Sequence, residues 1–248
     1  LTMQDITREH ETQKIREGFT NMMIHELRAP LTAIKGAAEL LLSAETQEED
    51  RTKMKLIIKN ASERLLIDID DMLDSAKIDA GKPLVTMIPS NINDVIRKST
   101  EELSYAIEDR SILIENHLDD NIPNFYFDPI RIGQVMANLL SNSIKYSEPH
   151  TLIEVFSRLR SGYVEVEVKD RGAGIERDKI DSLFKPFSQV TFARREKGTG
   201  LGLYISRAIL SEHEGKIWLH SEIGKGTSVF FTIPIHKKEE LEQPSLAN

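Results

Sequence analysis

The sequence predicts a protein of two parts: an all-α helical hairpin that pairs into a dimeric four-helix bundle, followed by an α/β sandwich. Residues 5–80 contain two glycines and one proline, whereas most of the 13 glycines and nine prolines of the 248-residue chain lie further on. The first part carries apolar residues at heptad spacing, and the second alternates helix-like and strand-like patterns. The change in composition places a domain boundary near Gly81-Lys82-Pro83.

The first part is predicted to be two antiparallel helices joined by a polar turn at residues 43–50. Apolar residues recur three or four positions apart along the first helix, at Ile24, Leu27, Leu31, Ile34, Ala38 and Leu41. A second run has helical spacing too, at Met54, Ile58, Ala61, Leu65, Met72 and Ala76. Because one hairpin would leave much of this apolar seam in water, we expect two copies to form a four-helix bundle.

The second part is predicted to be a mixed sheet with helices on one face. Valines take every second position of residues 163–169, so that one face of this strand is buried and the other is charged. Strands are predicted at 112–114, 125–127, 151–159, 163–169, 216–220 and 227–233. Helices are predicted at 93–110, with Asn91 or Asn93 as the cap, at 128–146 and at 201–214. Few helices for the number of strands indicate an α/β sandwich.

Charge and composition exclude several classes of protein. Asp and Glu number 40 against 32 Lys and Arg, a formal charge of -8, which argues against binding to nucleic acid. Without cysteine there are no disulfides, thiolate zinc sites or thiol nucleophiles. No run approaches the ~20 apolar residues that span a bilayer, so we expect no direct membrane contact in this segment. Because the chain begins with Leu1, we expect it to be part of a longer protein.

Two glycine-containing segments are candidate nucleotide contacts. Asp170 ends the alternating strand and precedes Gly172 and Gly174, so backbone can approach a ligand while the carboxylate accepts from an exocyclic amine. Residues 198–203 open a helix, whose unpaired N–H groups favour phosphate. No strand is predicted just before them, as a dinucleotide-binding fingerprint requires, and the chain has no Walker-type loop. Either segment could instead be a turn or loop without a ligand.

Two asparagines and a lysine suggest a metal and phosphate site. Asn138 and Asn142 lie four positions apart on one face of a predicted helix, and Lys145 follows one turn later. An amide oxygen suits hydrated Mg²⁺, and a lysine suits a polyphosphate. Because asparagine is unfavourable inside helices, two on one face favour a site over a solvated surface.

The first helix contains a candidate nucleophile, His25, followed by Glu26 and by Pro30, which removes a helix hydrogen bond. A neutral imidazole is a good nucleophile when a base takes the proton of its second nitrogen, and Glu26 is the adjacent candidate. The remaining histidines are interpreted as surface residues: His10, His117, His150, His213, His220 and His236.

Taken together and in this order, these segments resemble the sensor histidine kinases of two-component signalling, over nearly the whole chain. Similarity to the family's conserved boxes is seen at residues 19–42 (H box), 138–146 (N box), 170–175 (G1 box), 184–187 (F box), 198–203 (G2 box) and 224–227 (closing glycine motif). The resemblance implies a HisKA-type dimerisation and phosphotransfer domain, followed by an ATP-binding domain of the Bergerat (GHKL) type.

The resemblance also implies roles for the matching residues. His25 would accept the phosphoryl group, with Glu26 as general base, while Asn142 would hold Mg²⁺ and Asp170 would read the adenine amino group. The other implied contacts to ATP are Asn138, Lys145, Tyr146, Gly172, Gly174, Ile175, Phe187, Arg194, Arg195, Gly198, Thr199, Gly200, Leu201, Gly202, Leu203 and Thr227. Residues 174–198 would form a lid over ATP, which Phe187 helps to anchor.

The implied reaction is transfer of the γ-phosphoryl group of ATP to His25, and from there to an aspartate of a separate response regulator. Many relatives carry Thr or Asn four residues after the histidine to position water for dephosphorylating the regulator, and Ala29 here predicts weak phosphatase activity. Gyrase-type ATPases carry a glutamate where Asn138 stands, which disfavours simple hydrolysis. A scaffold that binds nucleotide without transferring phosphate is the third possibility, and the intact His25, Glu26 and Asn142 argue against it.

The expected organisation is a connector at 1–18, the dimerisation and phosphotransfer domain at 19–82, a linker at 83–89, the ATP-binding domain at 90–236 and a polar tail at 237–248. A cytoplasmic location is implied for this segment. The stimulus, the partner regulator, and whether His25 is served by its own or its dimer partner's ATP domain stay open.

Overall fold

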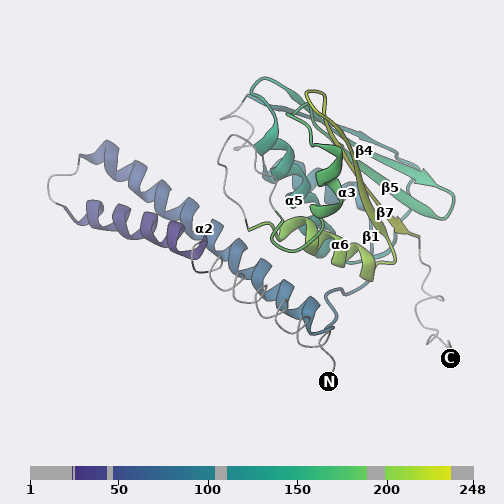
Figure 1. Cartoon of the computed structure of the whole chain (residues 1–248), viewed down its shortest axis with the longest axis horizontal. Helices are drawn as coiled ribbons and strands as arrows, with labels where there is room; N and C mark the ends of the chain where they lie inside the picture. The colour runs from purple at the N-terminus through teal and green to yellow at the C-terminus, as the bar shows by residue number, and fades with distance from the viewer. Residues whose placement is uncertain (1–23, 25, 44–46, 104–110, 189–198, 236–248) are drawn as a thin grey trace, which may run out of the picture. The chain divides into compact units, whose positions relative to one another are not determined.

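The computed structural model describes residues 24, 26–43, 47–103, 111–188 and 199–235. The chain divides into two compact units, one of residues Leu1–Ser75 with Lys197–Thr199 and the other of Ala76–Glu196 with Gly200–Asn248 (Figure 1). The first is helical and the second combines helices with a mixed sheet, which confirms the predicted order of a helical part followed by an α/β part.

The first unit is a helical hairpin. Residues 26–42 are helical and run antiparallel to α2, Glu48–Asp79 (Figure 1). Glu48, Glu49 and Asp50 lie in the first turn of α2 and Lys77 in its last, which suits the helix dipole. The predicted seam is buried only in part: Met72 is buried, whereas Ile24 and Leu31 are 47% and 58% exposed.

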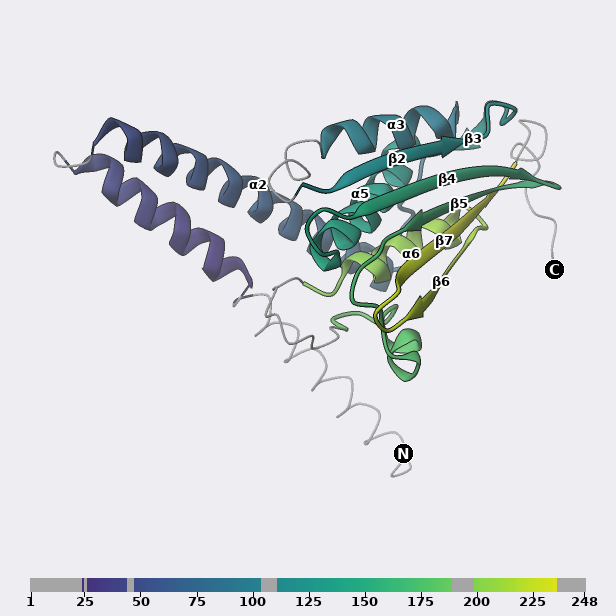
Figure 2. The same ribbon diagram turned by 90° about the horizontal axis from the view of Figure 1, so that it is seen from above.

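A five-stranded mixed sheet forms the centre of the second unit (Figure 2). Its strands, in spatial order, are β2 (Leu113–Leu118), β4 (Leu152–Arg160), β5 (Tyr163–Lys169), β7 (Gly226–Pro234) and β6 (Lys216–Glu222). β2 and β4 are parallel, and the other neighbours are antiparallel. A separate pair joins β1 (Ile88–Ser90) to β3 (Phe125–Phe127).

The helices α3 (Ile92–Glu102), α5 (Pro129–Tyr146) and α6 (Gly202–Glu212) cover one face of this sheet, as the periodicity of the strands predicts (Figure 2). Val164, Val166 and Val168 of β5 are fully buried beneath them, together with Phe231 of β7. The charged residues that alternate with these valines lie on the other face. α5 and α6 pack against each other and carry much of the candidate site.

Several elements differ from the prediction. α3 begins after its predicted cap, since Asn91 Oδ1 accepts from the backbone N–H of Asn93. It ends at Glu102, where Leu103 N–H turns back to Glu101, and residues 104–110 of the predicted helix lie outside the described ranges. β2 extends to Leu118, well beyond the predicted segment. The 3₁₀ helix η1, Arg177–Ser182, and the short strand β1, which contains Pro89, were not predicted.

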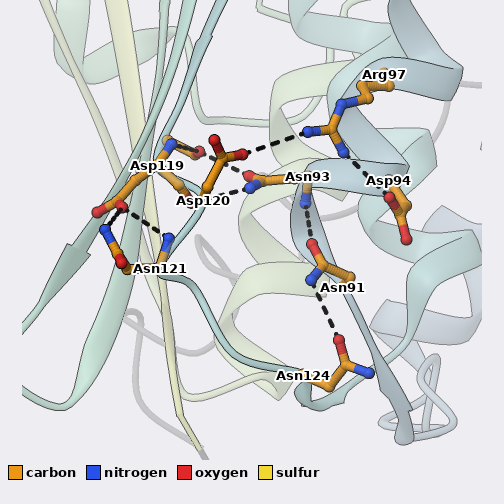
Figure 3. Close-up of polar contacts among 9 residues, drawn as sticks. Asn91, Asn93, Asp94, Arg97, Asp119, Asp120, Asn121 and Asn124 are labelled. Atoms are coloured by element: carbon orange, nitrogen blue, oxygen red, sulfur yellow. Dashed lines mark hydrogen bonds and ion pairs between the residues drawn. The ribbon is translucent and has the colours of Figure 1, made fainter.

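Polar side chains at the start of α3 form hydrogen bonds with the turn that follows β2 (Figure 3). Asn93 Nδ2 donates to the carbonyl of Asp119 at 3.0 Å, and Asn93 Oδ1 accepts from Ser157 Oγ at 2.7 Å. Backbone N–H groups of Asn121 and Leu159 also donate to the Asp119 carboxylate and lower its pKa. These hydrogen bonds hold the start of α3 against the sheet.

The interpretation of His213 as a surface residue is wrong. The side chain is completely buried at the end of α6. Its Nε2 accepts from the backbone N–H of Asp128 at 3.0 Å, so Nδ1 carries the proton and donates to the carbonyl of Ile209 at 2.7 Å. Asp128 in turn caps α5 by accepting from Ile130 N–H and Arg131 N–H, so His213 ties the end of α6 to the start of α5.

Within the described ranges, no helix combines the length and the apolar character that crossing a bilayer requires.

Candidate functional site

The two predicted asparagines contact each other on α5. Asn142 Nδ2 donates to Asn138 Oδ1 at 3.1 Å, and Asn138 Nδ2 donates to Ser206 Oγ of α6 at 3.0 Å. Ser206 is buried, so this chain of hydrogen bonds starts from a fixed point and orients both amides. Among the described residues, no hydrogen bond reaches the side-chain oxygen Oδ1 of Asn142, which can accept from or coordinate a ligand.

Gly202 brings α6 against the asparagine pair. A Cβ atom built on Gly202 would lie 2.1 Å from Asn138 Oδ1, so any larger residue would displace that amide. The G2 segment therefore contacts the N segment directly, although 64 positions separate Gly202 from Asn138 in the sequence. The N-cap residue of this helix, Leu201, has an apolar side chain and makes no side-chain cap hydrogen bond.

Asp170 forms the second centre of the candidate site, at the end of β5, and is 7% exposed. Its Oδ1 accepts from the backbone N–H groups of Gly172 at 2.8 Å and Thr227 at 3.1 Å. Its Oδ2 lies 3.4 Å from Ser143 Oγ of α5. The carboxylate is thus held by three donors from three segments of the chain.

Burial raises the pKa of Asp170 above its usual value, because a charged carboxylate loses water. The donors from Gly172, Thr227 and Ser143 act in the opposite direction and favour the charged form. A buried carboxyl with a perturbed pKa and a fixed orientation is typical of a functional site. Such a group can accept a hydrogen bond from a ligand amine when it is ionised.

The closing glycine motif packs directly on Asp170. A Cβ on Gly226, whose φ is 104°, would lie 2.1 Å from the carbonyl oxygen of Asp170. Ser221 Oγ bonds to Thr227 Oγ1 at 2.8 Å and accepts from Ile175 N–H at 2.8 Å. The G1 segment and the closing motif are therefore joined through one serine of β6.

Phe187 contacts the G2 segment. Its N–H donates to the carbonyl of Gly200 at 3.0 Å, and its φ of 63° places it in the left-handed region. A Cβ on Gly200 would lie 2.9 Å from the carbonyl carbon of Phe187. Leu201 is 1% exposed, whereas Leu203 is half-buried. The F and G2 segments are thus joined by a backbone contact.

Lys145 and Tyr146 lie together at the end of α5. Lys145 Nζ is 5.0 Å from the centre of the Tyr146 ring, a cation–π contact. Tyr146 is 38% exposed. The carbonyl of Tyr146 accepts from Ala173 N–H and so fixes the turn after Asp170.

Several predicted site residues lie outside the described ranges: His25, Arg194, Arg195 and Gly198. Glu26 and Thr199 are described, and Glu26 is half-buried on the first helix of the hairpin. The structure brings together Asn138, Asn142 and Gly202 in one group, and Asp170, Gly172, Gly174, Ile175 and Thr227 in another. Both groups lie at the C-terminal half of α5.

Sequence reasoning missed three serines that hold these groups: Ser143, Ser206 and Ser221. For Ser143 a signal was available, because it directly follows Asn142 on a helix that is otherwise apolar at buried positions. Ser206 and Ser221 gave no signal, since their partners are far away in the sequence.

The residues fit a magnesium ion only in company with a ligand. No group of three or more His, Cys, Asp or Glu side chains that could hold a metal occurs in the part of the chain that the structure describes. Asn142 offers one oriented amide oxygen. Mg²⁺ commonly takes one or two protein oxygens and completes its shell with water and phosphates, so this donor set suits a metal that arrives with a polyphosphate.

Two family models match separate parts of the chain. Residues 15–81 match the His Kinase A (phospho-acceptor) domain, and residues 127–237 match the histidine kinase-, DNA gyrase B-, and HSP90-like ATPase. The second match contains the asparagine pair and Asp170.

Curated relatives are similar over nearly the whole chain. The autoinducer 2 sensor kinase/phosphatase LuxQ of Vibrio parahaemolyticus is 32% identical over 94% of this chain and 28% of its own length. The sensor protein kinase WalK of Staphylococcus epidermidis is 31% identical over 94% of this chain and 38% of its own length. The chain thus spans about a third of the length of these relatives.

Solved structures share the fold. The histidine kinase ThkA in complex with the response regulator protein TrrA aligns with a TM-score of 0.66 at 26% identity, over 94% of this chain and 66% of that chain. The catalytic domain of ThkA aligns with a TM-score of 0.55 at 30% identity, over 60% of this chain and 98% of that chain.

Proposed function

The chain belongs to the histidine kinases, and we propose that it transfers the γ-phosphoryl group of ATP to His25 and then to an aspartate of a response regulator. The observation that carries the proposal is the presence of two neighbouring centres: the oriented amide of Asn142 on α5 and, beside Ser143 of the same helix, the buried carboxylate of Asp170 at the end of β5. A metal–phosphate contact and a base contact at the two centres are what an ATP site requires.

The residues around Asn142 would hold the phosphates and Mg²⁺. The metal, when bound with ATP, would neutralise charge on the phosphates. Lys145 would add a positive charge beside them, and Arg194 and Arg195, in the proposed lid at 174–198, would do the same. The remaining contacts to ATP are proposed for Tyr146, Phe187 and the G2 residues Gly198, Thr199, Gly200, Leu201, Gly202 and Leu203.

The residues around Asp170 would hold the base. An ionised carboxylate that is already oriented by Gly172 and Thr227 N–H groups accepts from an exocyclic amine without further ordering. Gly174 and Ile175 continue the same turn, and Ile175 N–H is tied to Ser221.

His25 would be the phosphoryl acceptor in the hairpin, with Glu26 taking the proton of the other ring nitrogen. The reaction depends mainly on positioning and charge neutralisation. Support for His25 comes from the match of residues 15–81 to the phospho-acceptor domain. The proposed domains are a connector at 1–18, this phosphotransfer domain at 19–82, a linker at 83–89, the ATP-binding domain at 90–236 and a tail at 237–248.

We also propose that the chain forms a homodimer through the hairpin. Large apolar side chains of α2 remain exposed in a single chain, including Leu66 at 63% and Ile67 at 62%. Exposed apolar residues concentrated on one helix favour association with a second copy. The regulator's receiver domain is the second proposed partner, and the proposed location of this segment is the cytoplasm.

Weak phosphatase activity is proposed from Ala29, which is exposed on the first helix of the hairpin. Its methyl group cannot bind water, so Ala29→Thr is expected to accelerate loss of phosphate from a phosphorylated regulator several-fold. The assay follows regulator phosphate with time, with the exposed change Thr32→Ala as a control. Rapid loss with the parent chain would contradict the proposal.

The kinase reaction is tested by incubating the chain with γ-labelled ATP and Mg²⁺. Label on the parent that is stable in alkali and labile in acid, and absent from His25→Gln and Asn142→Ala, supports the proposal. His117→Gln, a change at an exposed histidine of β2, is the matched control and should keep the label. Equal labelling of the parent and His25→Gln would refute the proposal.

A further inference from the structure

Ser143 is a buried hydroxyl that faces the base end of the site. It is 3% exposed, follows Asn142 on α5 and lies 3.4 Å from Asp170 Oδ2. The side chains of adjacent helical residues point about 100° apart, so one helix can direct Asn142 to the phosphates and Ser143 to the base. Ser143 therefore joins the two centres of the site.

The two oxygens of Asp170 are not equivalent. Oδ1 accepts from two backbone N–H groups, those of Gly172 and Thr227, which fix it. Within the described residues, Oδ2 accepts one hydrogen bond, from Ser143. A distance of 3.4 Å is long for a bond between a hydroxyl and a carboxylate, which is usually about 2.5–3.0 Å. The Ser143 hydroxyl can therefore rotate to another acceptor at little cost.

We propose that Ser143 contacts the base of ATP and helps to select adenine, by donating to ring nitrogen N1 while Asp170 Oδ2 accepts from the 6-amino group. The inference rests on the proposed function and adds a residue to its nucleotide site. Oδ2 and the hydroxyl of Ser143 present an acceptor beside a donor. Adenine presents the complementary pair, an amine beside an unprotonated ring nitrogen.

Guanine presents the opposite pattern, a carbonyl beside a protonated ring nitrogen. Its carbonyl would face the Asp170 carboxylate without a shared hydrogen, and both groups would be buried and unpaired. A site built to pair with specific donors and acceptors rejects an analogue that leaves them unpaired much more strongly than an apolar site does. Ser143 and Asp170 together thus account for a preference for 6-aminopurines.

A purely structural role for Ser143 makes a different prediction. If the hydroxyl only holds Asp170 in place, its loss weakens the binding of ATP, and of every analogue that retains the amine, by the same factor. If the hydroxyl contacts N1, its loss removes the difference between ATP and 1-deaza-ATP, in which a C–H group replaces N1. The two roles are therefore separated by a cycle of two ligands and two proteins.

The experiment measures the affinity of the full chain for ATP and for 1-deaza-ATP by competition, with the parent, Ser143→Ala, Ser143→Thr and Ser141→Ala. Ser141 is exposed on the same helix, and its hydroxyl bonds to the carbonyl of Asn138. The parent, Ser141→Ala and Ser143→Thr, which retains the hydroxyl, should bind 1-deaza-ATP about 3- to 10-fold more weakly than ATP. Ser143→Ala should bind the two ligands about equally.

The outcomes also separate this inference from the proposed function. If the parent binds ATP but does not distinguish it from 1-deaza-ATP, the inference is wrong and the proposed function stands. The same holds if Ser143→Ala distinguishes the two ligands as the parent does. If the parent binds neither ligand, both are wrong. Thermal melting of each variant establishes that it is folded, and the parent's own ratio decides the question if Ser143→Ala does not fold.

Discussion

The two units of the chain bury their apolar residues to different extents. In the ATP-binding unit, alternate valines of β5 and the ring of Phe231 have no exposed surface. In the hairpin, Leu31, Leu42 and Leu66 are 58%, 88% and 63% exposed. The ATP-binding unit has a core of its own, whereas the hairpin presents apolar surface that a second copy or another partner would cover. We therefore expect mutations in the two units to fail in different ways.

The largest expected effect is on the core of the ATP-binding unit. Phe231→Ala removes a fully buried ring and is expected to lower the free energy of unfolding by about 3–5 kcal/mol. Urea denaturation of the ATP-binding unit measures the loss. Phe230→Ala, on the opposite face where the ring stacks on Trp218, is the control and should cost less. Equal losses for the two variants would mean that the core is not where we place it.

The next effect tests the exposed surface of the hairpin. Leu66→Asp places a charge at the proposed dimer surface and is expected to weaken dimerisation by about 2–4 kcal/mol while ATP affinity is unchanged. Sedimentation equilibrium measures the monomer–dimer ratio. Asn60→Asp introduces the same residue at an exposed polar position of α2 and should leave the dimer intact. A parent chain that is monomeric would show that the exposed apolar surface of the hairpin is not a dimer surface.

A smaller effect is expected at Asp170, inside the ATP-binding unit. Asp170→Asn removes the charged acceptor and should weaken ATP binding by about 10- to 100-fold, which corresponds to about 1.5–3 kcal/mol for a hydrogen bond to a charged group. Burial raises the pKa of Asp170, so the parent should lose ATP affinity as the pH falls through that raised value and the carboxylate takes up a proton.

The measurement for Asp170 is a titration with ATP at several pH values. Asp120→Asn is the control, because the side chain of Asp120 is 91% exposed. An affinity that rises as the pH falls, or a parent and Asp170→Asn that respond to pH alike, would show that the ionised carboxylate does not bind the base.

The smallest effect concerns Asp68, a buried acid in the hairpin. Asp68 is 8% exposed, and its Oδ2 has no hydrogen-bond partner in the described part of the chain and lies 4.0 Å from Arg64 Nε. It also continues the apolar seam, three positions after Leu65 and four before Met72. Asp68→Leu should therefore stabilise the hairpin by about 1 kcal/mol at neutral pH.

The pH dependence of this effect has a definite sign. Burial and the nearby charge of Glu26 raise the pKa of Asp68, and Arg64 opposes them. The folded chain then holds its proton more tightly than the unfolded chain, so the parent gains stability as the pH falls from the raised pKa towards the ordinary one. Thermal melting at several pH values measures the difference in stability between Asp68→Leu and the parent. This difference should become smaller over that pH range. A variant that is less stable at neutral pH would indicate that the carboxylate is paired in the assembled protein.

Local periodicity made much of the ATP-binding unit predictable. Strand β5 was predicted at its exact bounds, because its alternation of valine with charged residues is complete. Strand β1 could not be predicted, since its three residues include Pro89 and it exists only through pairing with β3. The residues of the site show the same difference. Asp170 could be predicted because it follows a clear strand, whereas Ser206 could not, because its role depends on contact with a helix far away in the sequence.

Exposure was harder to predict than helical structure. The heptad spacing of the hairpin predicted the helices, but Ile24 and Leu31 are exposed in the single chain, as we expect if a second copy completes the proposed bundle. His213 was misassigned for the opposite reason. Its burial depends on the meeting of the end of α6 with the start of α5, which no local pattern encodes.

We infer that ATP held by one unit phosphorylates a histidine in the other. The most direct test is to incubate the full chain with ATP and Mg²⁺ at neutral to alkaline pH and locate the phosphoryl group by mass spectrometry of its peptides. We expect phosphate on His25 and on no other histidine. Phosphate on a different residue, or an unmodified His25 in a chain that binds ATP, would contradict it.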